Sequence, residues 1–343
     1  MIIVDMHAHY MSPHLIDEAE RNGAYYGVRV ERNAGGVACV AFNGGPLSRP
    51  FFHELCDLAH RIPAMDATGI AMQVLSTWTD VAGDDLPARE AARWVRLQND
   101  TLAEDIHLFP GRFAAMGTLP LQDVDAALAE LDHIVDDLGM RSVELVTSIN
   151  GSDLDHPDFR PLWKRLEKRN VFVFLHPPLR PVGLNRTRDY FLNNLISFPT
   201  DTTIAAAKLM FGGVMDAFPG LKVGLAHSGG FLPFQIGRFD LGYDKHPACS
   251  KVLTQRPSNL LSRFVFDTLT HHDKALSFVV DMVGADNMVY GTDYPFEMME
   301  TVGPQRIARL PGLSDDARDG ILSGNIHALL ADTPRRFTAK TDI

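Results

Sequence analysis

The chain has 343 residues, of which 45% are hydrophobic and 22% charged, so its composition predicts a packed core and excludes a largely disordered protein. Its formal net charge of −11 argues against a nucleic-acid-binding surface, which requires a basic field. An anionic small-molecule substrate stays open, because a bound cation and arginine side chains reverse the sign of the field locally.

Short β-rich runs alternate with longer helical patterns along the chain, which is typical of a parallel sheet built from βαβ units. Runs such as VFVFL (171–175) are almost entirely apolar, as in strands buried on both faces. No GxGxxG follows the first run, which argues against dinucleotide binding. We predict a closed (β/α)8 TIM barrel with strands at Ile2–Met6, Ala71–Ser76, Phe113–Thr118, Ser142–Val146, Val171–Leu175, Lys222–Ala226, Phe264–Asp267 and Met288–Tyr290.

Residues 10–60, between the first two strands, depart from this repeat. They are rich in Gly and Asn, and they end in a predicted helix at Phe52–Met65. Loops of this length in a compact domain are usually functional or disordered. Because the segment follows the first strand, we expect a small insertion that forms a lid over the carboxyl-terminal face of the barrel. The whole chain, 1–343, is interpreted as one domain that carries this insertion.

Apolar residues at three- and four-residue spacing predict the helices between the strands. The helix at Asp123–Leu138 begins with an acidic first turn and stops at Gly139, a residue that favours helix ends. Similar patterns predict helices at Phe159–Asn170, Thr202–Phe218 and Asp273–Val283.

Polar side chains that suit metal binding stand where four apolar strands stop. His7 and His9 follow the first strand, His176 the fifth, His227 the sixth and Asp293 the eighth. Active sites of barrel enzymes lie at these strand ends, and alternate residues such as His7 and His9 share a face. Each residue alone could be structural, but together they predict a divalent metal site that suits zinc and tolerates manganese or iron(II).

Six segments spread over the chain carry a family resemblance: DMHAHY (5–10), GTLPLQD (117–123), FLHPP (174–178), the stretch 211–238, YGTDYPF (290–296) and GNIHALL (324–330). With them the chain resembles the amidohydrolase superfamily. The similarity is to the branch of α-amino-β-carboxymuconate-ε-semialdehyde decarboxylase (ACMSD) and related nonoxidative decarboxylases. Asn194 stands where the ACMSD pattern has an aromatic residue, and the lid bears little likeness, so the resemblance does not fix the substrate.

The resemblance implies that His7, His9, His176 and Asp293 bind the metal, with His227 beside it as an acid–base or orienting group. Asp293 could act as ligand, base or both in turn. Dinuclear members of the superfamily use a carboxylated lysine after strand 4. The corresponding stretch here, SVELVTSIN, contains no lysine, so we expect one metal ion, zinc before manganese.

Two arginines match the carboxylate clamp of ACMSD-like enzymes, and the planar fork of arginine suits a carboxylate. They are Arg49, at the end of the lid, and Arg238, in PFQIGR. In that family the second arginine reaches into the neighbouring subunit, which implies a homodimer. A surface or helix-capping role is the alternative for each. Phe296 and Trp78 are placed to pack on a flat substrate ring, or else in the core.

The favoured function is a metal-dependent nonoxidative decarboxylase, a carbon–carbon lyase, for a small aromatic or muconate-type carboxylic acid. The alternative is a metal-dependent hydrolase or hydratase of a small cyclic or unsaturated acid, which would use the same ligands. A noncatalytic barrel is a third interpretation, against which the intact ligand set argues.

We expect a cytoplasmic enzyme with no membrane partner. Cys39, Cys56 and Cys249 form no CxxC pair and no even disulfide framework. The first residues do not have the pattern of a signal peptide. No apolar stretch approaches the roughly 20 residues that cross a bilayer.

Overall fold

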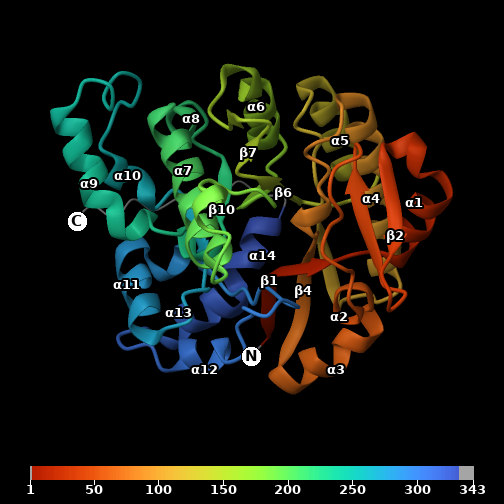
Figure 1. The fold of residues 1–343 in the computed structure, drawn as a ribbon. Helices are drawn as coiled ribbons and strands as arrows, with labels where there is room; N and C mark the ends of the chain where they lie inside the picture. The colour runs from red at the N-terminus through yellow and green to blue at the C-terminus, as the bar shows by residue number, and fades with distance from the viewer. Residues whose placement is uncertain (1, 332–343) are drawn as a thin grey trace.

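The computed structural model describes residues 2–331, and these residues form the predicted barrel (Figure 1). One run of parallel strands has the order β1-β4-β5, and a second has the order β12-β11-β10-β9-β6. Parallel bridges between Gly117 and Val143 and between Ala8 and Tyr294 join the two runs at both seams. The barrel strands are β1 (Ile3–Tyr10), β4 (Ile70–Thr77), β5 (Phe113–Met116), β6 (Ser142–Val146), β9 (Phe172–His176), β10 (Lys222–Leu225), β11 (Phe264–Asp267) and β12 (Met288–Val289).

Helices surround the strands as an outer layer (Figure 1). The predicted helix at Asp273–Val283 is α11 with the same bounds. Asp123 is the N-cap of α5, not its first residue, because its side chain accepts a hydrogen bond from Ala126 N at 2.8 Å. The main outer helices are α4 (Ala88–His107), α5 (Val124–Asp136), α6 (Arg160–Lys168), α7 (Phe198–Phe211), α9 (Leu232–Lys245), α11 (Asp273–Val283) and α12 (Gly303–Ala308), with shorter α8 (Val214–Ala217), α10 (Pro257–Leu261) and α13 (Asp315–Asp319).

The prediction of one continuous helix at Thr202–Phe218 is wrong. The structure has α7 up to Phe211 and then α8, with a break at Gly212 and Gly213. Gly213 has φ of 68°, a left-handed conformation that glycine adopts without steric cost and that ends an α-helix.

The insertion after β1 contains α1 (Pro13–Tyr26), an antiparallel hairpin of β2 (Val28–Arg32) and β3 (Ala38–Phe42), and then α2 (His53–Cys56) and α3 (Leu58–Thr68). The single helix predicted at Phe52–Met65 is therefore two helices. Asp57 separates them, because its backbone is extended and its side chain accepts a hydrogen bond from His60 N at 2.9 Å, as an N-cap does.

Strand β1 is longer than the sequence predicts, since it continues past Met6 to Tyr10. His7 and His9 therefore lie inside the strand. Neighbouring segments satisfy the extra backbone groups: Met6 N donates to Tyr290 O at 2.9 Å, and His9 N donates to Tyr294 O at 2.8 Å. Pairing on both sides holds the two histidines in a rigid part of the barrel.

An apolar cluster fills the barrel interior below the histidines. Its side chains come from the strands and from α14 (Asn325–Leu330), which contributes Ile326 and Leu329. The His7 ring packs on this cluster, with its centroid 4.9 Å from that of Phe174. The histidines therefore lie above the apolar cluster, at the carboxyl-terminal mouth of the barrel. Within residues 2–331, no helix combines the length and the apolar character needed to cross a membrane.

Candidate active site

The four side chains predicted to bind a metal come together at the barrel mouth. His7 and His9 lie in β1, His176 is the last residue of β9, and Asp293 follows β12. All four are buried, and each offers one ligand atom within 4.8 Å of the others. Nε2 of His7 lies 3.2 Å from Nε2 of His9, and Asp293 Oδ1 lies 3.2 Å from His9 Nε2.

The protonation states of His176 and Asp293 fit a divalent cation. Burial and the neighbouring imidazoles hold the pKa of His176 well below its usual value, so its ring is neutral and keeps a lone pair. Burial alone would raise the pKa of Asp293, but the imidazoles of His227, His9 and His7 hold it well below its usual value. Asp293 Oδ1 is buried and accepts no hydrogen bond of normal geometry. An ionised oxygen and imidazole lone pairs crowded in a buried site form a donor set that suits zinc or manganese.

Each of the three histidines uses Nδ1 in a hydrogen bond and turns Nε2 toward the other ligands. Such a bond fixes the tautomer and the ring orientation of a metal-binding histidine. The partners of Nδ1 are Asp267 Oδ2 at 2.8 Å for His7, Ser76 Oγ at 3.1 Å for His9 and Pro177 O at 2.9 Å for His176.

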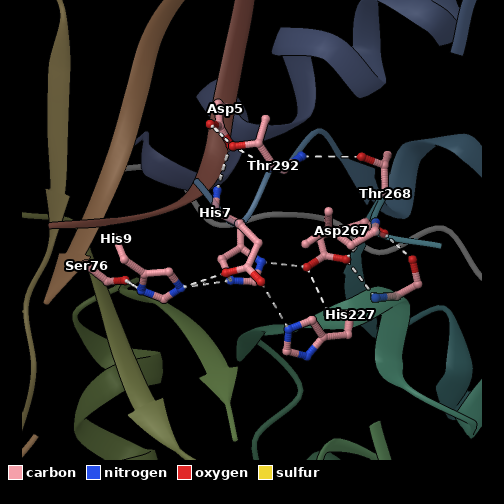
Figure 2. A network of polar contacts seen from close by, with 12 residues as sticks. Asp5, His7, His9, Ser76, His227, Asp267, Thr268 and Thr292 are labelled. Carbon is pink, nitrogen blue, oxygen red and sulfur yellow. Dashed lines mark hydrogen bonds and ion pairs between the residues drawn. The ribbon is translucent and has the colours of Figure 1, made fainter. Parts of the chain in front are cut away.

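Asp267 is a buried carboxylate that the sequence did not single out. It accepts hydrogen bonds from His7 Nδ1 and from the backbone amides of His227 at 2.9 Å and Ser228 at 2.7 Å. Burial would raise the pKa of Asp267, but the hydrogen bond with His7, the electrostatic interaction with the His7 and His227 side chains and the backbone amide of Ser228 lower it. In Figure 2, His7 lies between His9 and Asp267. Asp267 ends the apolar strand β11, so the signal that identified His176 could have identified it.

Glu144, in the middle of β6, is a second buried carboxylate that the sequence did not single out. It accepts a hydrogen bond from Ser76 Oγ at 2.9 Å, and burial raises its pKa. Because Ser76 uses its proton on Glu144, its oxygen is left to accept from His9 Nδ1. No spacing or strand-end position marks Glu144, so the sequence carries no signal for it.

Asp5 connects the strand that carries His7 to the segment that carries Asp293. It accepts from Thr292 Oγ1 at 2.6 Å and from Thr292 N at 3.0 Å (Figure 2). It also accepts from Gln73 Nε2 at 2.8 Å. Its carboxylate thereby links β1, β4 and the segment that follows β12.

His227 lies beside the ligand group, as the sequence predicts. Its Nε2 is 3.9 Å from Asp293 Oδ2, and its ring centroid is 5.2 Å from that of His176. The backbone of His227 has φ of 55° and that of Asp293 has φ of 60°, a region that costs non-glycine residues of order 1–3 kcal/mol. The surrounding packing and hydrogen bonds keep His227 and Asp293 in this strained conformation, in which both side chains face the barrel mouth.

A cavity of about 700 Å³ opens from the ligand group, and the insertion after β1 supplies part of its wall. Trp78, Phe296 and Arg49 all line it, as do His176, His227 and Asp293. The Phe296 ring lies 5.6 Å from the Trp78 ring and 5.2 Å from the His9 ring. A flat ligand would meet aromatic faces on the way to the metal ligands.

Arg238 lies elsewhere on the chain. It is exposed on α9 and is not among the residues that line this cavity. Asp80 and Phe191 also line the cavity, and the sequence did not indicate either of them as a site residue.

Comparisons with known proteins agree with this geometry. A family model described as amidohydrolase matches residues 4–331. The chain is 31% identical over 339 residues to a 2-amino-3-carboxymuconate-6-semialdehyde decarboxylase of Dictyostelium discoideum, covering 97% of this chain and 93% of the relative. It is 32% identical to a gamma-resorcylate decarboxylase of Rhizobium radiobacter, covering 76% of this chain and 84% of the relative.

A solved structure of a dihydroxybenzoic acid decarboxylase from Polaromonas sp. JS666, with bound manganese and the inhibitor 2-nitroresorcinol, has the same fold. Its TM-score is 0.73 at 22% identity, over 96% of each chain. These comparisons confirm the resemblance seen in the sequence motifs. The chain belongs to the amidohydrolase family.

Proposed function

We propose that this protein is a metal-dependent nonoxidative decarboxylase, a carbon–carbon lyase, that acts on a small aromatic or muconate-type carboxylic acid. The observation that carries the proposal is the buried group of His7, His9, His176 and Asp293, which opens into an aromatic cavity that also contains Arg49. The decarboxylases among its relatives support the same reaction class.

One divalent ion, zinc in preference to manganese, would be held by three imidazoles and one carboxylate. Strand β6 contains no lysine, which favours a single ion over a pair bridged by a carboxylated lysine. A bound divalent ion acts as a Lewis acid and stabilises negative charge that develops on the substrate.

The chain's own residues would bind the acid and move a proton. Arg49 binds an anionic group of the substrate, and Phe296 packs against its flat face, whereas the buried Trp78 supports the Arg49 guanidinium from below. Decarboxylation replaces a carboxylate with a proton at the same carbon. His227 and Asp293, with 3.9 Å between Nε2 and Oδ2, hold and deliver that proton at the cavity floor.

We also propose that two copies associate through α9. Leu195, Phe231, Phe234 and Phe278 are exposed and line one groove beside the cavity, and His227 lines both. Arg238 stands one helical turn after Phe234 on α9. A second copy seated on this apolar groove would bury it and would bring its own Arg238 toward the neighbouring site.

The direct test is carbon dioxide release from a panel of hydroxybenzoates, aminobenzoates and carboxymuconates, with protein loaded with zinc or manganese. We expect release from at least one acid, and none from metal-free protein. Hydrolysis or hydration of a ring or double bond, with no carbon dioxide, would replace the decarboxylase by the hydrolase or hydratase alternative. Purified protein that contains no metal, and that neither ion activates, would refute both.

A further inference from the structure

The guanidinium group of Arg49 is held from three sides. Its Nε donates to Asp80 Oδ2 at 2.8 Å, and its Nη2 donates to Asp80 Oδ1 at 3.1 Å. Its Cζ lies 4.7 Å from the ring centroid of Trp78 and 5.6 Å from that of Phe296. These contacts fix both the plane of the group and its rotation within that plane.

This pairing leaves one defined edge of the guanidinium open. The side-on pair with Asp80 uses Nε–H and one hydrogen of Nη2. The adjacent edge, formed by Nη1 and the second hydrogen of Nη2, has no hydrogen-bond partner within the described part of the chain. Two parallel N–H donors on one edge match the two oxygens of a carboxylate.

The open edge belongs to the cavity above the metal ligands. Arg49 lines that cavity, and its side chain is 55% exposed, whereas the Asp80 side chain is 2% exposed. Phe296 contacts Arg49 on one side and the His9 ring on the other, with 5.2 Å between the ring centroids. A carboxylate on the open edge would thus keep an attached ring against aromatic faces next to the metal group.

Asp80 connects Arg49, a residue of the insertion, to the barrel. It lies in the short 3-10 helix Thr79–Val81, one residue after the end of β4, so the barrel fixes its place. Arg49 instead belongs to the stretch between β3 and α2, outside the barrel strands. Precise binding geometry requires such support for a long side chain on a loop.

From this geometry we infer that Asp80 is a positioning residue, which holds Arg49 with a single open edge so that the site binds its ligand through one carboxylate. The inference rests on the proposed function for the class of ligand, a small aromatic acid. It assigns Asp80 no contact with the reacting atoms.

Simple electrostatics predicts the opposite result for removal of Asp80. Loss of a negative charge close to the clamp would strengthen binding of any anion. Positioning predicts weaker binding, because an Arg49 side chain without its partner must be ordered by the ligand itself. The sign of the change in affinity therefore separates the two roles.

The experiment titrates zinc-loaded protein with benzoate and with its neutral analogue benzamide, by calorimetry. For Asp80→Asn we expect benzoate to bind about tenfold more weakly and benzamide to change less than about twofold. Asp85→Asn is the matched control, because it removes a nearby carboxylate that pairs with Arg180 instead of Arg49. On a substrate that is turned over, Asp80→Asn should raise KM with little change in kcat.

Two further variants show whether Asp80 acts through Arg49. In an Arg49→Ala background, Asp80→Asn should have no additional effect on benzoate, and this double variant leaves no buried charge unpaired. Arg49→Lys keeps the charge beside Asp80 but removes the second edge, so it too should weaken benzoate about tenfold. Tighter benzoate binding in Asp80→Asn, an equal loss in both backgrounds or unchanged binding in Arg49→Lys would overturn the inference.

Failure of this inference and failure of the proposed function give different results, because the titration needs no turnover. Benzoate binding that depends on Asp80 and Arg49, without carbon dioxide release from any acid, would refute the decarboxylase and keep the positioning role. Carbon dioxide release, together with an unchanged benzoate affinity in Asp80→Asn, would refute the positioning role and keep the decarboxylase.

Discussion

Asp267 Oδ2 lies 2.8 Å from Nδ1 of His7, and both side chains are fully buried. The bond turns Nε2 of His7 toward the other ligands. Burial alone would lower the pKa of His7, but the bond with Asp267 and the charges of Asp293 and Asp267 raise it to about 9, so a cation that binds here displaces the proton of Nε2. A carboxylate that orients a ligand in this way usually accounts for a factor of about 10–100 in metal affinity.

Asp267→Asn should therefore weaken zinc binding by about 10–100-fold. Asn has one acceptor oxygen where Asp267 accepts from His7 and from the amides of His227 and Ser228. Competition with a zinc chelator measures the affinity. Asp316→Asn, an exposed change on α13, is the control and should bind zinc like the wild type. Equal affinity in Asp267→Asn would show that the backbone alone orients His7.

His9→Ala should lose most of the bound metal and the activity while the barrel still folds. The imidazole provides one of the four ligand atoms, and His9 is not part of the apolar cluster that fills the barrel. Metal content by atomic emission and the far-ultraviolet circular dichroism spectrum test the two halves of this expectation. His107→Ala, on an exposed position at the end of α4, is the matched control. A fully active and metal-loaded His9→Ala would count against the site.

Asp201→Asn should stabilise the protein at high pH. Burial of the Asp201 side chain raises its pKa from 3.8 to about 6, although Val182 N donates to it at 3.2 Å. A raised pKa in the folded state means that stability is lost as pH rises from about 4 through 6. The asparagine variant escapes this loss, so at pH 8 it should gain on the order of 1–3 kcal/mol in free energy of unfolding.

Urea unfolding of metal-free protein at pH 5 and pH 8 tests this dependence without interference from metal loss. The advantage of Asp201→Asn should shrink at pH 5, since the wild-type carboxyl is then largely protonated. Asp189→Asn, an exposed substitution on the loop after β9, should show no such difference. A constant advantage at both pH values would contradict the titration of Asp201.

Mixing two inactive variants tests the contribution of Arg238 across a dimer. A heterodimer of His227→Ala and Arg238→Ala subunits contains one site with both residues intact, if each site takes its arginine from the other chain. Random exchange of equal amounts should restore about a quarter of the wild-type sites. Activity of the mixture, with exchange shown by mass spectrometry, is the measurement. Exchange without recovered activity would confine Arg238 to its own chain or to no role.

The ligand group was predictable because each ligand interrupts an apolar run or follows it closely. His176 ends β9, and the residues of β1 before His7 are apolar except for Asp5. The barrel follows from the same runs, since strands buried on both faces leave few other architectures. Asp267 also stands at the end of an apolar strand. The sequence alone does not assign it to the site, because an aspartate after a strand is also common as a cap of the next helix or turn.

Other features depend on contacts that no local pattern records. Glu144 lies within an apolar strand, and only the folded barrel brings Ser76 to it. Asp80 resembles any turn aspartate until the insertion places Arg49 beside it. The break between α2 and α3 at Asp57 was missed, because its capping bond competed with an otherwise helical pattern.

The carboxylate of Asp5 bonds to Thr292, which is 287 positions away in the chain. Thr292 adjoins Asp293, and Asp5 is two residues from His7, so this bond and the complete ligand group depend on the same contact between the two ends of the chain. The first and last strands must meet before any cation finds its full set of donors. Metal binding with the full affinity of the site would therefore report that the two ends of the barrel have joined, because a chain that still lacks its last strand offers three imidazoles and no carboxylate.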